Sequence, residues 1–295
     1  MDWHERPSAF ERLSPPWVDV SCVERSGTIR DDSRVVLVIK QGAVKIPWVL
    51  GHKDFVEGRQ FCDYQIAGPF EFWQQVHKVE PVAGLERESR CILTDTVEFR
   101  PPLGAAGWLS GATYVKSELA RLFRYRHAVM RREIALRKRY FKRPLRVLIS
   151  GATGLVGRHL VAMLHTQGHE VLVLNRDTTV PGVKNIWWDP IRGEIENGGP
   201  EIMENLDAIV HLSGRNVTAG RWTLTEKQLI YESRIKSTSY LASLVQALKN
   251  PPKAVVVASA MGYYGGRGSE PLTEESSAGT GFLAEVCRDW EAAAM

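Results

Sequence analysis

Two residues near the end of the chain could together form a proton donor. Tyr263 and Arg267 lie four positions apart in the stretch SAMGYYGGRG. On an α-helix this spacing places a cation beside a phenol, which lowers the pKa of the phenol and lets it exchange a proton with a substrate. A glycine pair, Gly265 and Gly266, separates the two residues and argues against a helical turn. The spacing alone therefore does not establish a proton donor.

A glycine-rich stretch in the middle of the chain could hold phosphates. The motif GATGLVG spaces Gly151, Gly154 and Gly157 between a β-type run at 145–150 and a helical run at 158–167. In such a unit the first glycine permits a tight turn, the second lets a pyrophosphate approach the backbone, and the third lets helix and strand pack closely. The free N–H groups of the helix attract phosphate. The alternative is a structural turn without a ligand. We predict a dinucleotide site formed by Gly151, Thr153, Gly154, Leu155, Val156 and Gly157.

The residues at the end of the second predicted strand, at 170–176, indicate which of the two nicotinamide cofactors would bind. An acid at this place would accept hydrogen bonds from a ribose 2′-hydroxyl, but the chain has Asn175 and Arg176 instead. A guanidinium suits a 2′-phosphate and can stack on adenine. We therefore predict NADP(H) rather than NAD(H) as cofactor. The small residues after the strand at 207–214 would let the backbone approach the cofactor ribose; they are Leu212, Ser213 and Gly214.

Three further residues keep two interpretations each. His211 is either a structural residue at a strand end or a catalyst. Asp189 either accepts a hydrogen bond from the adenine amine or begins the Asp-Pro turn. Arg234, in SRIKST, either binds an anionic group or lies on a solvated helix face.

The pattern of secondary structure changes at Pro144. Before it, β-type runs at 34–39, 46–55, 59–66, 72–81 and 90–99 precede a helix at about 113–140, which predicts an antiparallel sheet packed on one helix. After it, strands and helices alternate, which predicts a doubly wound parallel sheet. We therefore divide the chain into an α+β domain at 1–143 and an α/β Rossmann domain at 144–295. The chain starts on a helix and stops after one, so we expect a first strand and a C-terminal substrate segment to be missing.

Composition narrows the class of protein. The chain has no apolar run long enough to span a bilayer and no signal-peptide core, and its four cysteines are scattered. We expect a cytoplasmic protein without a metal site. Residues 121–146 hold eleven Lys or Arg against one acid, Glu133. Because apolar residues such as Met130 and Ile134 recur there at helical spacing, we interpret the run as a helix with one buried face, and expect neither a nucleic-acid nor a membrane partner.

These motifs resemble known families. Residues 145–295 resemble the extended short-chain dehydrogenase/reductase superfamily, nearest to nucleoside-diphosphate-sugar epimerase-like proteins. The stretches HLSGRNV, SRIKST, SAMGYYGGRGSEPLTEES and GFLAEVCRDWEAA are similar to one epimerase-like branch, sometimes labelled as a cell-division inhibitor. Residues 1 to about 140 resemble the helix-grip domain of the START and polyketide-cyclase group through WHERPSAFERLSPPW and HAVMRREI.

The resemblance implies where catalytic residues would lie. In the superfamily a serine after the fifth strand and a Tyr-x-x-x-Lys pair on the next helix do the chemistry. Ser259 matches that serine, but the tyrosine and lysine positions fall on Leu283 and Cys287, which cannot do this work. Either Tyr263 or Tyr264 matches the tyrosine of a loop that faces the nicotinamide. The candidate catalytic residues are therefore Ser259, Tyr263 and Tyr264.

Two functions fit this pattern. The first is an NADP-dependent oxidoreductase or epimerase-like enzyme acting on an unknown small molecule. The second is a catalytically silent NADP-binding regulatory or sensor protein, which the missing Tyr-Lys pair favours. In either case the resemblance of the front domain implies a cavity for a hydrophobic ligand. His52 and Asp54 share a strand face there, but nothing nearby marks a nucleophile or a metal.

Overall fold

The computed structural model describes residues 1–82, 90–102, 104–196 and 200–295, with only the backbone described at 104–112. It divides the chain into two compact units, Met1–Tyr140 and Phe141–Met295. Both predicted classes are confirmed, an α+β front unit followed by a parallel-sheet Rossmann-like unit. Among the described residues, no helix combines the length and the apolar character that crossing a bilayer requires.

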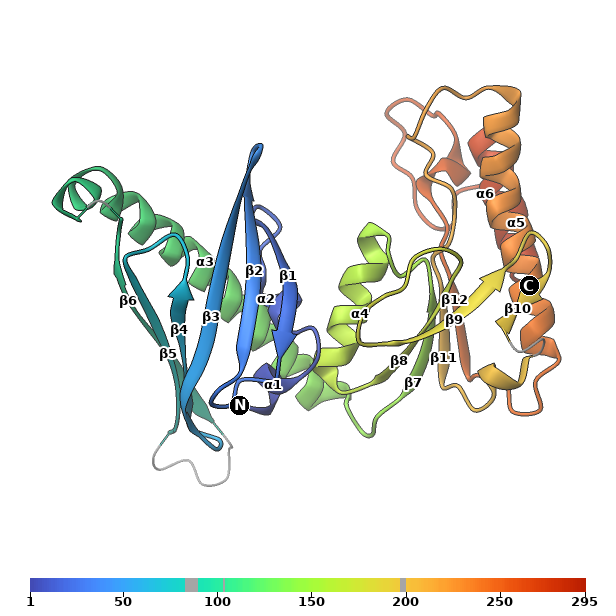
Figure 1. Ribbon diagram of the computed structural model, residues 1–295. Coiled ribbons are helices and arrows are strands. Elements are labelled where there is room, and N and C mark those ends of the chain that lie inside the picture. The colour runs from blue at the N-terminus through green and yellow to red at the C-terminus, as the bar shows by residue number, and fades with distance from the viewer. Residues whose placement is uncertain (83–89, 103, 197–199) are drawn as a thin grey trace. The chain divides into compact units, whose positions relative to one another are not determined.

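The front unit is an antiparallel sheet with a long helix across one face (Figure 1). Six strands follow in simple sequence order, each paired with the next. They are preceded by two short helices, α1 (Asp2–Glu5) and α2 (Ala9–Leu13), and followed by α3 (Gly104–Tyr140). The strands are β1 (Asp19–Ser26), β2 (Arg34–Gln41), β3 (Val44–Val56), β4 (Gln60–Ala67), β5 (Phe72–Pro81) and β6 (Cys91–Arg100).

The sequence pattern missed two features of this unit. Strand β1 has mostly polar, exposed residues, so that no β-type alternation marks it. On α3, Ile134 was expected on the buried face but is 50% exposed, and the neighbouring Glu133 is fully buried instead. Glu133 accepts a hydrogen bond from Arg12, which follows from the need of a buried carboxylate for a counter-charge.

The second unit is a parallel sheet with helices on both faces (Figure 1). Its strand order is β10-β9-β8-β7-β11-β12, and all pairs are parallel except the short edge pair of β9 and β10. The strands are β7 (Arg146–Ser150), β8 (Glu170–Asn175), β9 (Lys184–Asp189), β10 (Glu194–Ile195), β11 (Ala208–His211) and β12 (Ala254–Val257). The strand order reverses between β7 and β11, where doubly wound sheets bind ligands beyond the carboxyl ends of the strands.

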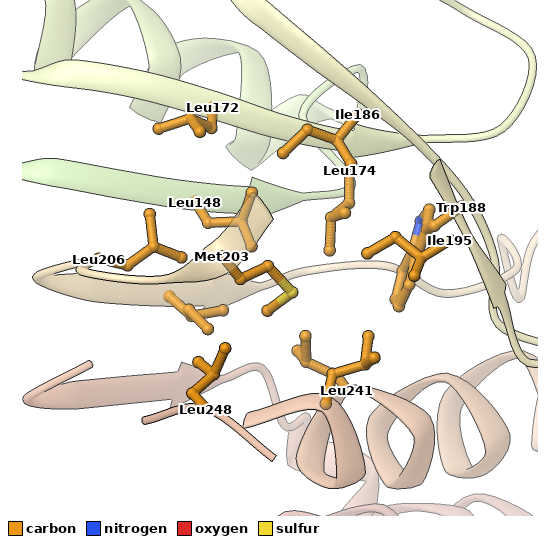
Figure 2. Packing of buried hydrophobic residues seen from close by; sticks show 12 residues of the cluster. Leu148, Leu172, Leu174, Ile186, Trp188, Ile195, Met203, Leu206, Leu241 and Leu248 are labelled. Carbon is orange, nitrogen blue, oxygen red and sulfur yellow. The ribbon is translucent and has the colours of Figure 1, made fainter. Parts of the chain in front are cut away.

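Two apolar clusters fix the helices on the sheet. On one face, Val161 of α4 (Leu155–Gln167) packs with Val147, Ile149 and other sheet residues. On the other face, Leu241 of α5 (Leu224–Gln246) packs with Leu148 and further core residues, and Figure 2 shows these side chains converging from strands and helix. A third helix, α6 (Phe282–Ala293), packs on α5. Residues that alternate along β7 thus go to opposite faces, as a sheet buried on both sides requires.

Candidate dinucleotide site

The turn from β7 into α4 is shaped by backbone contacts that exclude side chains. Gly151 has φ +73°, and a Cβ there would lie 2.7 Å from the carbonyl carbon of Leu212. A Cβ on Gly157 would lie 2.2 Å from the carbonyl oxygen of Gly151. Helix α4 begins after Gly154, whose N-cap position offers no side-chain hydrogen bond. The first N–H groups of the helix are thus left for an anion.

A cleft of about 490 Å³ opens at the carboxyl ends of the strands. Most of the predicted cofactor residues line it, namely Gly151, Thr153, Gly154, Asn175, Arg176, Leu212, Ser213 and Gly214. The remaining three predicted residues lie outside its lining. Leu155 and Val156 are 70% and 64% exposed on the first turn of α4, and Gly157 packs against the turn itself.

At the end of β8 the two polar residues differ in how they are engaged. Asn175 donates its side-chain amide to the Asn185 Oδ1 at 2.6 Å, so that it braces the neighbouring strand. Arg176 is exposed and lines the cleft. No carboxylate in the described part of the chain forms an ion pair with Arg176, which leaves its guanidinium for an anionic group of a ligand.

His211, with 0% exposure, is a structural residue beneath this cleft. Its Nδ1 lies 2.5 Å from the Ser150 hydroxyl and its Nε2 lies 3.2 Å from the Ser237 hydroxyl. Burial lowers the pKa of His211 to about 4, so the ring is neutral at physiological pH. The geometry favours the structural interpretation of this residue, because both ring nitrogens are taken by hydroxyl groups that hold β7, β11 and α5 together.

Asp189 and Arg234 are also engaged by the protein. The Asp189 carboxylate accepts hydrogen bonds from the backbone N–H groups of Ile191 and Arg192, at 3.0 and 3.3 Å, and so forms the turn after β9. The Arg234 guanidinium lies over the Trp290 ring, 5.1 Å from its centroid. A Cβ on Gly214 would lie 3.0 Å from this guanidinium, so Arg234 packs beneath the cleft wall and not on a solvated face.

Several cleft residues escaped the sequence analysis. Helix α5 contributes Leu229, Glu232, Ser233 and Ser237 to the lining, and Arg215 follows Gly214. Arg215 donates two hydrogen bonds to the Glu226 carboxylate, at 2.6 and 2.9 Å, and so is tied to the start of α5. The sequence could have indicated these residues, because α5 follows β11 in the chain and its first turns must lie near the carboxyl edge of the sheet.

The predicted catalytic residues lie beyond β12 and outside the lining of the cleft. The Ser259 hydroxyl donates to the Glu291 carboxylate at 2.5 Å, a partner that the sequence analysis did not assign. Tyr263 and Tyr264 form an edge-to-face pair within a short 3₁₀ turn, Met261–Tyr264. Arg267 follows that turn and donates to the Ser277 carbonyl and, at 3.0 Å, to the Ser277 hydroxyl.

The two positions that the resemblance assigns to tyrosine and lysine hold Leu283, which is half-buried, and Cys287, which is buried. Leu283 and Cys287 lie on α6 beneath Gly262. Cys287 is 3% exposed, and burial raises the pKa of its thiol. Neither side chain can relay a proton to a ligand. Among the described residues, no group of three His, Cys, Asp or Glu side chains could hold a metal ion.

Comparison with known proteins indicates the family to which the second unit is similar. Residues 147–284 match the model of the NAD dependent epimerase/dehydratase family. Residues 147–284 therefore form an epimerase/dehydratase domain. It begins at β7 and includes the glycine turn, the cleft and the start of α6, which is the arrangement that a nicotinamide cofactor requires.

Relatives of this domain are called epimerase family proteins. One from Mycobacterium bovis is 38% identical over 148 residues, which cover 50% of this chain and 47% of the relative. Human epimerase family protein SDR39U1 is 33% identical over 153 residues, covering 51% of this chain and 49% of the human protein. The chain thus spans about half the length of the curated relatives it matches.

A solved structure resembles both units. The nucleoside-diphosphate sugar epimerase from Corynebacterium glutamicum is 33% identical and has a TM-score of 0.75, over 99% of this chain and 59% of that one. The match spans the residues of both units of this chain.

Proposed function

We propose that the epimerase domain binds NADP(H) in the cleft and serves an oxidoreductase or epimerase reaction on a small molecule. The observation that carries the proposal is the exposed Arg176 at the end of β8, which lines the cleft without an ion pair among the described residues. The glycine turn and the open helix N-terminus would hold the diphosphate. The guanidinium would hold the 2′-phosphate of the adenosine ribose.

The chain's own residues suggest a division of tasks in such a reaction. The Ser259 hydroxyl donates a hydrogen bond to Glu291, which leaves the serine oxygen with lone pairs that can accept from a substrate hydroxyl or water. Tyr263 and Tyr264 supply the phenols of this region, and either could donate a proton to a carbonyl oxygen. The bound cofactor would supply or accept the hydride.

A second function is favoured by one observation. By the resemblance, Leu283 and Cys287 stand at the proton-relay positions, so that a half-buried leucine and a buried cysteine replace the tyrosine and the lysine. A protein that binds NADP(H) without turnover, as a sensor or regulator, would need no such pair.

Titration of the full chain with NADPH and with NADH tests the cofactor assignment. We expect NADPH to bind more tightly, and the Arg176→Ala variant to lose about tenfold or more in NADPH affinity with little change for NADH. Arg192→Ala is the matched control, because Arg192 is exposed, pairs with Asp189 and lies outside the cleft lining. Tighter binding of NADH, or an equal effect of both variants, would reject the assignment.

Turnover separates the two functions. The absorbance of NADPH is followed with a panel of carbonyl substrates, for the unchanged chain and for the Tyr263→Phe and Tyr264→Phe variants. Oxidation of NADPH that one of these variants reduces at least tenfold supports the enzyme. Cofactor binding without oxidation on any substrate supports the sensor.

A further inference from the structure

The front unit encloses a second cavity, which is independent of the cofactor cleft. Its volume is about 520 Å³. Apolar side chains of the sheet, among them Leu37, Trp48 and Trp73, form most of its wall, and α3 contributes Leu119 and Leu122. A cavity of this size and lining suits an apolar small molecule.

Polar groups of the cavity on β3, β4 and β5 belong to an alternating row of imidazoles and carboxylates that continues to β6 and α3. The His52 Nε2 lies 3.1 Å from one oxygen of Asp63, and the His77 Nε2 lies 3.3 Å from the other. The His77 Nδ1 lies 2.5 Å from an oxygen of Asp95, whose second oxygen lies 2.5 Å from the His127 Nε2. The carboxylate of Asp63, which lines the cavity, thus has an imidazole within ion-pair distance of each of its oxygens.

The other charged groups that line the cavity are mostly matched as well. Glu5 lies 3.1 Å from Arg30, Arg25 lies 3.9 Å from Glu11, and Glu118 lies 3.9 Å from Arg121. The charged lining residues with a described carboxylate or cation in reach thus have their counter-charge within the protein, and a ligand charge is not needed to balance them.

Arg126 of α3 is the exception within the described part of the chain. It lines the cavity, and its Nε donates to the Leu13 carbonyl at 3.4 Å. No described carboxylate lies within ion-pair distance of its guanidinium, although a guanidinium has five N–H donors. Burial lowers the pKa of Arg126, although the nearby charges of Asp63 and Asp95 act in the opposite direction. The Arg126 side chain is half-buried, and a partly desolvated cation with open donors is stabilised when an anion or a hydrogen-bond acceptor meets it.

We propose that the front cavity binds an apolar small molecule that carries one anionic group, such as a carboxylate, and that Arg126 binds this group. The apolar wall takes the body of the ligand, while two N–H donors of the guanidinium suit the two oxygens of a carboxylate. On the sheet side the carboxylate of Asp63 lies 3.1 Å from His52, so the anionic group of the ligand is directed to Arg126 on α3. This site goes beyond the proposed function, since it lies in the other unit and does not depend on NADP(H).

A matched pair of fluorescent probes tests this site on the full chain. Anilinonaphthalene sulfonate carries an anion on an apolar body, and N-phenylnaphthylamine has the same body without the charge. Both are titrated with saturating NADPH present, so that the cofactor cleft is filled. We expect the unchanged chain to bind the anionic probe about tenfold more tightly than the neutral one.

Substitutions then localise the anion. We expect Arg126→Met to weaken the anionic probe about tenfold or more while the affinity for the neutral probe stays within about twofold. Arg124→Met, at an exposed position of the same helix, should change neither affinity. Near-ultraviolet circular dichroism shows whether each variant keeps its packed aromatic residues.

Two outcomes overturn the proposal. One is an anionic-probe affinity that a folded Arg126→Met variant leaves unchanged. The other is equal binding of both probes by the unchanged chain, a result that needs no variant. If Arg126→Met fails to fold, Arg126→Lys takes its place, because lysine keeps the charge but lacks the planar guanidinium. If Arg126→Lys binds both probes as tightly as the unchanged chain does, a guanidinium site is rejected.

Discussion

The stability of the front unit should fall as the pH rises from 6.5 to 9, because of His77. This imidazole is 7% exposed and lies between Asp63 and Asp95. Burial alone would lower the pKa of His77, but hydrogen bonds to the two carboxylates raise it from 6.5 to about 9. The ring of His4 also packs on this site, and burial keeps it neutral by lowering its pKa to about 3.

The magnitude follows from the shift. At 1.36 kcal/mol per pKa unit, the rise of the His77 pKa from 6.5 to about 9 corresponds to about 3 kcal/mol of folding free energy. A group whose folded-state pKa is raised contributes all of this below its unfolded pKa, and loses it as the pH passes through the folded value. The contribution is therefore complete below about pH 6.5 and gone above about pH 9.

The assay compares urea unfolding of the unchanged chain and of His77→Gln between pH 6.5 and 10. The difference in unfolding free energy between them should be largest at the low end and shrink as the pH rises, while titrations common to both chains cancel. A difference between the unchanged chain and His77→Gln that stays constant or grows with pH would refute the assignment of a charged His77.

Two further predictions concern the epimerase domain. Gly157→Ala should weaken NADPH binding at least tenfold in calorimetry and lower stability by about 1–3 kcal/mol in urea unfolding, since its Cβ would lie 2.2 Å from the Gly151 carbonyl oxygen. Gly220→Ala is the control, because a Cβ there meets open space and should have no effect. If the protein tolerates both changes equally, the close packing at Gly157 is contradicted. Burial lowers the folded-state pKa of His211 from 6.5 to about 4, so the stability that the neutral ring contributes should be complete above pH 6.5 and fall by up to about 3 kcal/mol towards pH 4. His211→Gln should remove that acid-induced loss in circular dichroism measurements, and an unchanged acid transition would disprove it.

Local patterns explain why the second unit could be predicted well. Strands such as β7 and β8 are largely apolar runs, and the turn that joins β7 to α4 is marked by three glycines at intervals of three residues. The two-residue β10 and the polar β1 carry no such pattern, so neither was expected. Their pairing partners, β9 and β2, determine that they are strands.

Side-chain partners across elements could not be predicted. Alternation along one strand predicts that His52 and Asp54 share a face, whereas in the structure the His52 imidazole lies beside the carboxylate of Asp63 on the neighbouring β4. Ser259 likewise meets Glu291 across 32 positions of the chain. Such contacts depend on strand register and helix packing, which the residue types at each position do not reveal.

The alternating imidazoles and carboxylates of the front unit have a consequence for its evolution. Asp63, His77 and Asp95 are the interior links of this row. Replacing any one of them leaves the charge of its neighbour unpaired inside the protein, which costs several kcal/mol for a buried ion. Only coordinated replacement of adjoining links avoids that cost. Descendants of this chain should therefore exchange these residues together or keep them all, and a lineage that lost a single interior link would have had to pass through a poorly folded ancestor.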